Sequence, residues 1–174
     1  MAWWLTIYCT QSVAQLDGAQ LLRGIQDQDP LAPAGVDYAT LAEDYGVSDE
    51  AAAAAVANLR TAPPDGAHPL DVALRYLPDD EARPVQLHCW TTTDRVAEEV
   101  EECREGRSPP KDVGPVLDDC KEIIGIELGG SQLGTMAVVL AYEVARYLAQ
   151  KGDGAFVDDD DEWFAVHDGA FVDP

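Results

Sequence analysis

Lysine and arginine are scarce in this chain of 174 residues: there are 11 of them against 33 aspartates and glutamates, for a formal net charge of −22. Proteins that bind nucleic acid or anionic membranes use a positively charged surface for the purpose. The scarcity therefore excludes nucleic acid and membrane as main targets. It favours a basic partner instead, because a strong negative field attracts cations over long distances.

The chain also lacks a long hydrophobic run. The longest, Met136 to Tyr142, is far shorter than the roughly 20 residues that a membrane-spanning helix needs. No Lys or Arg precedes the apolar stretch Trp3 to Ile7, and no small-residue cleavage site follows it. We therefore expect neither a secretory signal nor a membrane-spanning segment.

Paired cysteines are missing as well: no CxxC occurs, and no spacing of cysteine and histidine matches a zinc site. Cys9 and Cys89 continue alternating apolar patterns, and Cys103 and Cys120 continue helical ones. On such inward faces a thiol behaves as a small hydrophobic group. We expect four buried free thiols and hence the reducing environment of the cytoplasm.

Apolar periodicity and turn residues predict the secondary structure of the chain. Strands are expected over 3–10, 72–76, 85–89 and 122–128, and helices over 14–27, 37–45, 48–60, 94–105, 112–120 and 132–151. The hexapeptide Asp153–Asp158 recurs as Asp168–Asp173, with an apolar stretch between the copies, which predicts a three-stranded meander. The pattern indicates a single α+β domain over residues 1–174, with a mostly antiparallel sheet and helices on one face. Our first choice of topology is a ferredoxin-like open sandwich with this C-terminal β-meander.

No catalytic motif stands out. The segment Gly129–Thr135 joins a strand to a helix as a phosphate loop does, but Thr135 stands where lysine is needed, and we interpret the segment as a turn capped by Ser131. His88 and Cys89 are neighbours in a strand, so they face opposite sides and form no dyad. We expect no catalytic residue, metal or cofactor. The alternative is a small enzyme or ligand-binding domain with a site between sheet and helices.

Carboxylates are what the chain has in excess. The helix 94–105 has an acidic outer face, and residues 158–162 are an unbroken acidic run without the alternating ligands and mid-loop glycine of a calcium-binding loop. We predict that these carboxylates bind a basic protein. The predicted partner-binding residues are Glu98, Glu99, Glu101, Glu102, Glu105, Asp158, Asp159, Asp160, Asp161 and Glu162. The alternative explanation is adaptation of the whole surface to a salt-rich or GC-rich source.

Several features together resemble bacterial immunity proteins, which neutralise co-encoded toxins. They are the short acidic chain, the Trp3–Trp4 first strand, the apolar helix 132–151, and the closing pattern Gly152–Asp158 followed by Glu162–Phe164. The resemblance implies a cytoplasmic inhibitor without catalysis and carries over no functional residue. Trp3 and Trp4 point to opposite faces, so one of them needs cover from a helix or another protein. A homodimer that buries an open sheet face is a further alternative.

Overall fold

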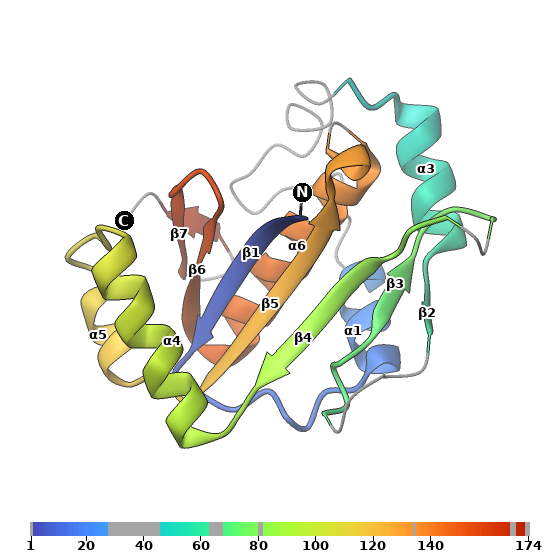
Figure 1. Ribbon diagram of the computed structural model, residues 1–174. Helices are drawn as coiled ribbons and strands as arrows, with labels where there is room; N and C mark the ends of the chain where they lie inside the picture. Colours follow the sequence, from blue (N-terminus) through green and yellow to red (C-terminus); the bar gives the residue numbers. More distant parts are fainter. Residues whose placement is uncertain are drawn as a thin grey trace.

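The strands form a single antiparallel sheet. The computed structural model describes residues 2–27, 46–62, 68–79, 82–133, 135–167 and 170–172. Within these residues eight strands follow the order β2-β3-β4-β5-β1-β6-β7-β8, and every neighbouring pair is antiparallel (Figure 1). The strands are β1 (Ala2–Cys9), β2 (Arg60–Ala62), β3 (Ala73–Arg75), β4 (Val85–Trp90), β5 (Glu122–Gly129), β6 (Gly154–Asp158), β7 (Trp163–His167) and β8 (Ala170–Val172). The α+β class and the C-terminal meander β6–β8 are as predicted.

Helices cover both faces of this sheet. They are α1 (Gly18–Asp27), α3 (Asp49–Asn58), α4 (Thr93–Gly106), α5 (Gly114–Asp118) and α6 (Met136–Gly152), with a 3₁₀ turn η1 (Gly130–Gln132) before α6. Helices α1, α3 and α6 pack on one face, and α4 and α5 on the other (Figure 1). Among the described residues no helix has the length and apolar character needed to cross a membrane.

The central strands β4, β5, β1 and β6 stand in the order of a ferredoxin-like sandwich. Strands β5 and β6 flank β1 and are joined through α6, a split β-α-β arrangement. The expectation of helices on one face was wrong, because β4 and β5 are joined through α4 and α5 on the opposite face. Helix α4 has its own apolar stripe, formed by Val96, Val100 and Cys103. This stripe is buried against the face of the sheet opposite to α6.

The main core lies between α6 and the centre of the sheet. Leu5 and Ile7 of β1 and Ile124 and Ile126 of β5 are fully buried there, and α6 is buried along nearly its whole length. Such a helix is apolar over most of its circumference, as the sequence predicted. It begins after Thr135, whose hydroxyl accepts a hydrogen bond from Ala137 N–H.

The opposite face has a smaller core and is covered only in part. Tyr8, Ile123 and Trp163 pack there under the apolar stripe of α4 and under Leu117 of α5. Near the other end of β1, β5 and β4 no described helix lies over this face (Figure 1). One end of the sheet face is thus closed and the other is open.

Most predicted boundaries agree with the structure to within a few residues. Helix α1 begins at Gly18, later than expected, because Asp17 and Gln20 exchange backbone-to-side-chain hydrogen bonds of 2.8 and 2.9 Å that define its start. Helix α6 ends at Gly152, one residue later than predicted, and Asp153 after it adopts the left-handed conformation (φ 48°). The helix predicted over 37–45 lies outside the described residues.

Gly154 gives a test of the packing between β1 and β6. A Cβ atom at this position would lie 2.1 Å from the carbonyl oxygen of Tyr8, whereas at Gly106 it would meet nothing within 4 Å. We expect Gly154→Ala to lower the free energy of unfolding by about 2 kcal/mol, because the backbone of β1 must move. The control Gly106→Ala should leave it unchanged or raise it slightly. Urea unfolding followed by circular dichroism measures both, and equal stability of the two variants would contradict this close approach.

Candidate functional site

The acidic face of α4 results from the spacing of its apolar residues. Val96, Val100 and Cys103 are buried at helical spacing, which turns the remaining positions outward. The glutamates at 98, 101, 102 and 105 are exposed, and Glu99 is half-buried. Arg95 forms ion pairs with Glu98, at 2.8 Å, and with Glu99. The helix therefore presents a fixed row of carboxylates that one arginine neutralises in part.

Asp158 does not belong to the exposed surface. It is 2% exposed, its Oδ2 accepts a 2.7 Å hydrogen bond from the Tyr142 hydroxyl of α6, and its Oδ1 accepts from the backbone N–H groups of Asp160 and Glu162 at 2.9 Å each. This corrects the prediction that Asp158 contacts a partner. Its role is to hold the β6–β7 turn, which exposes the carboxylates that follow it, at Asp159–Glu162.

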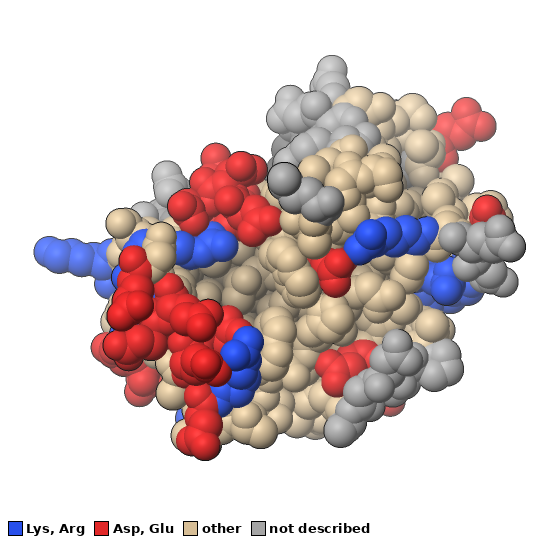
Figure 2. All heavy atoms as spheres, in the orientation of Figure 1, with Lys and Arg blue, Asp and Glu red and all other residues tan. Residues whose placement is uncertain are grey.

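Arg107 joins the two acidic segments, which lie about fifty residues apart in the sequence. It follows α4 directly and donates to the carbonyl oxygen of Asp158 and, at 2.8 Å, to Asp161 Oδ1, while its Nη2 lies 3.8 Å from Asp159 Oδ1. Figure 2 shows the result: the acidic side chains of α4 and of the β6–β7 turn gather on neighbouring parts of one face. We call this set the acidic surface: Glu98, Glu99, Glu101, Glu102, Glu105, Asp159, Asp160, Asp161 and Glu162.

The acidic surface keeps a net negative charge after its own ion pairs are counted. Arg95 and Arg107 together serve four of its carboxylates. Within the described residues no ion pair involves Glu101, Glu102, Glu105, Asp160 or Glu162. These carboxylates remain available for a cationic partner.

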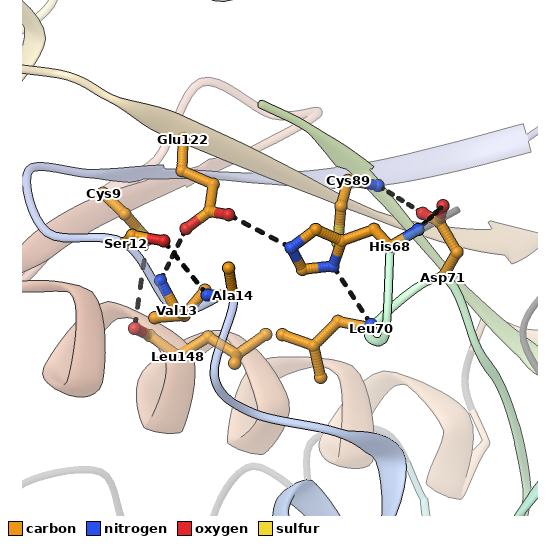
Figure 3. Close-up of polar contacts among 10 residues, drawn as sticks. All are labelled: Cys9, Ser12, Val13, Ala14, His68, Leu70, Asp71, Cys89, Glu122 and Leu148. Carbon is orange, nitrogen blue, oxygen red and sulfur yellow. Dashed lines mark hydrogen bonds and ion pairs between the residues drawn. The ribbon is translucent and has the colours of Figure 1, made fainter. Parts of the chain in front are cut away.

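A second polar cluster lies beneath the main sheet and has the composition of a catalytic site (Figure 3). Glu122, at the start of β5, is 2% exposed and accepts a 2.5 Å hydrogen bond from Val13 N–H. Its other oxygen lies 3.1 Å from His68 Nε2. Asp71 accepts a 2.7 Å hydrogen bond from the backbone N–H of Cys89. A histidine, two carboxylates and a cysteine thus lie close together, although the sequence placed Cys89 and Glu122 in separate strands and gave no sign that they meet.

The geometry of this cluster argues against catalysis. His68 Nδ1 accepts a 3.1 Å hydrogen bond from Leu70 N–H, so the ring carries its proton on Nε2 and donates it to Glu122. Neither ring nitrogen is left to take a proton from a substrate. The cluster instead ties three separate segments together, around Val13, His68 and Glu122.

The surroundings of the cysteines are not those of an activated nucleophile. All four are free thiols, but only Cys9 and Cys103 are buried as expected; Cys89 and Cys120, also expected to be buried, are half-buried. Burial raises the pKa of each thiol above its ordinary value, and the neighbouring Asp71 raises the pKa of Cys89 further. A thiol needs a lowered pKa to react as a nucleophile at neutral pH.

The glycine segment before α6 is a turn, as interpreted, but its hydrogen bonds differ from the prediction. Gln132, not Ser131, makes the local bond: its side chain accepts from Gly129 N–H at 2.8 Å and donates to the Arg83 carbonyl at 3.0 Å. A cavity of about 460 Å³ adjoins the segment, lined mainly by apolar residues such as Ala55, Tyr76 and Met136. Its described lining brings no set of charged groups together. Among the described residues, no three His, Cys, Asp or Glu side chains are placed to hold a metal ion.

Comparison of the chain with protein-family models, with curated proteins and with solved structures gives no match.

The structural role of Glu122 can be tested by removing its charge. Glu122→Gln places an amide N–H₂ among the N–H groups of Val13 and His68, so that donors face donors. We expect the free energy of unfolding to fall by about 2 to 3 kcal/mol. Glu105→Gln, on the acidic surface, should leave it unchanged within error. Denaturant unfolding of both variants is the measurement, and an unaltered midpoint for Glu122→Gln would refute the structural role.

The raised thiol pKa values lead to a chemical test. At pH 8 the thiols of the folded protein are protonated and largely buried, so they should react with Ellman's reagent far more slowly than a small thiol does. After unfolding in guanidinium chloride all four should react at once. One thiol that reacts quickly in the folded protein would show an activated cysteine and would reopen the possibility of thiol chemistry.

Proposed function

We propose that this protein is a non-enzymatic binding module whose acidic surface engages a basic protein. The observation that carries the proposal is the joining of α4 and the β6–β7 turn through Arg107 into one acidic face. Two segments distant in the sequence converge there, and the carboxylates left without cations point outward.

The acidic surface is supported from beneath, which suits a docking role. The apolar stripe of α4 is buried against the sheet, and Asp158 fixes the turn through Tyr142 of α6. Carboxylates held in place by a rigid scaffold lose less conformational entropy on binding than carboxylates on a mobile loop. The net charge of −22 adds a long-range field that raises the association rate of a positively charged partner.

Adaptation of the whole surface to salt would place acids evenly over the molecule. In the view of Figure 2 they gather over α4 and the β6–β7 turn, while the neighbouring sheet face is mostly uncharged. On this face of the molecule the uneven distribution supports selection by a partner over a general effect of solubility.

The resemblance to immunity proteins extends the proposal to an inhibitor of a basic toxin, acting in the cytoplasm. Two features support it: four free thiols, which suit a reducing compartment, and an acidic surface complementary to the cationic cleft of an enzyme that acts on anionic substrates. The protein would act by covering that cleft.

A charge-reversal experiment tests the role of the acidic surface. In the variant Glu101→Lys, Glu102→Lys, Glu105→Lys, three exposed carboxylates without an ion pair become cations near the C-terminus of α4, where the helix dipole tolerates them. Association with the purified basic partner, captured at low ionic strength, should slow by about tenfold at low salt. Its dependence on ionic strength should also become flatter. Stopped-flow kinetics at several salt concentrations measure both effects.

The matched control changes the net charge equally at exposed acids outside the acidic surface: Glu50→Lys, Asp112→Lys, Asp119→Lys. It should associate with the partner within about twofold of the unaltered protein, because local charge dominates steering at short range. If the α4 variant associates as fast as the unaltered protein at low salt, the acidic surface is not the binding site. If both variants slow equally, net charge alone is responsible.

A further inference from the structure

The open part of the second sheet face carries an aromatic cluster beside the acidic surface. Trp4 of β1 and His88 and Trp90 of β4 all point to the face that α4 covers only in part. Their ring centroids lie 5.4 Å apart for Trp4 and His88 and 6.5 Å apart for His88 and Trp90. The tryptophans are half-buried, and the His88 side chain is 42% exposed.

Because Gly125 has no side chain, these rings can lie close to the backbone of the sheet. It stands directly opposite His88 in the β4–β5 pair, and a Cβ atom there would come within 2.7 Å of the Trp90 ring and 3.0 Å of the Trp4 ring. The two indoles therefore meet over the bare backbone of β5. We call Trp4, His88, Trp90 and Gly125 the aromatic platform.

Carboxylates border the platform on two sides. The backbone N–H of Trp4 donates a 2.9 Å hydrogen bond to Asp159 Oδ2, which places the β6–β7 turn of the acidic surface at one edge. At another edge Glu127 lies opposite Trp4 in the β1–β5 pair, with an oxygen 3.4 Å from His88 Nε2 and another 2.7 Å from Arg83 Nη2. Figure 2 shows a hollowed, mostly uncharged surface next to the acids of α4 and the turn.

We propose that this platform receives an arginine side chain from a basic segment of the partner protein, an inference that rests on the proposed function. A guanidinium stacks on an indole face and forms forked hydrogen bonds to a carboxylate, and here both groups stand side by side. Aromatic rings give affinity to a cation already drawn in by the acidic surface. Charge disfavours a second copy of this chain as the occupant, because two molecules of charge −22 repel each other.

The test uses two peptides of equal charge, nona-arginine and nona-lysine, as probes. The chain has four tryptophans, whose indole N–H signals are resolved by nitrogen-15 NMR and assigned with single Trp→Phe variants. Nona-arginine should shift the signals of Trp4 and Trp90. It should leave Trp3, which packs on the opposite face against the main core, and Trp163, which is 7% exposed, unchanged. Nona-lysine should perturb the amides of α4 with a much smaller effect on the two platform indoles.

Affinity measurements with variants complete the test. Trp4→Leu and Trp90→Leu should each weaken nona-arginine binding by roughly two- to fivefold at low salt. The matched control Trp3→Leu, one position away on the same strand and facing α6, should leave binding unchanged. The NMR titration itself is made on the unaltered protein, and its indole signals can also be assigned from through-space contacts to neighbouring residues, so a variant that fails to fold does not prevent a decision.

The outcomes separate this inference from the proposed function. If nona-arginine shifts the amides of α4 and the β6–β7 turn but neither platform indole, the acidic surface stands and the platform proposal is wrong. Equal shifts of the platform indoles with both peptides would contradict selection of arginine. If neither peptide perturbs α4, the turn or the indoles, both proposals fail.

Discussion

Packing of α6 against β1, β5 and β6 is the interaction on which the rest of the molecule depends. It buries the alternating residues of three strands on one side, and so determines which side chains must point to the other. From the same helix, Tyr142 reaches Asp158 at the end of β6, and Asp158 in turn orders the β6–β7 turn. Arg107 then links that turn to the end of α4. The position of the acidic surface is thus set by contacts that begin in the core.

The carboxylates of this chain divide into two groups by their surroundings. Among the described residues, those that are buried, Glu122, Glu143 and Asp158, are all satisfied: Glu143, for example, forms a forked pair with Arg146, with distances of 3.0 and 2.5 Å. A buried carboxylate needs such partners because its loss of hydration is costly. These groups hold the fold together. The excess charge therefore belongs to the exposed acids, and among them α4 and the β6–β7 turn form the continuous surface.

Alternation of apolar residues was enough to predict β1, β4 and β5, and the repeated hexapeptide was enough to predict the meander, because both are local signals that need no tertiary information. The acidic face of α4 was predictable for the same reason. The burial of Asp158 was not, since it depends on a tyrosine from another element, and nothing in a run of acids distinguishes its first member. The His68–Glu122 contact likewise needs three segments in their folded positions.

The aromatic platform shows where a sequence signal was present but incomplete. The neighbours Trp3 and Trp4 had to face opposite sides of the sheet, so an uncovered tryptophan was foreseeable, but its companions were not. They depend on the register that sets His88 opposite Gly125, and on α4 packing at only one end of the face. Because α4 covers only one end of this face, the acidic surface and the aromatic platform would contribute to different steps of binding. Exposed acids act at long range and mainly raise the rate of association, whereas contacts with half-buried aromatic rings form only after docking and mainly slow dissociation. A partner whose positive charge suits the negative potential of this protein, but which lacks a suitably placed arginine, would then associate and dissociate quickly. Specificity among basic partners would therefore arise at the aromatic platform.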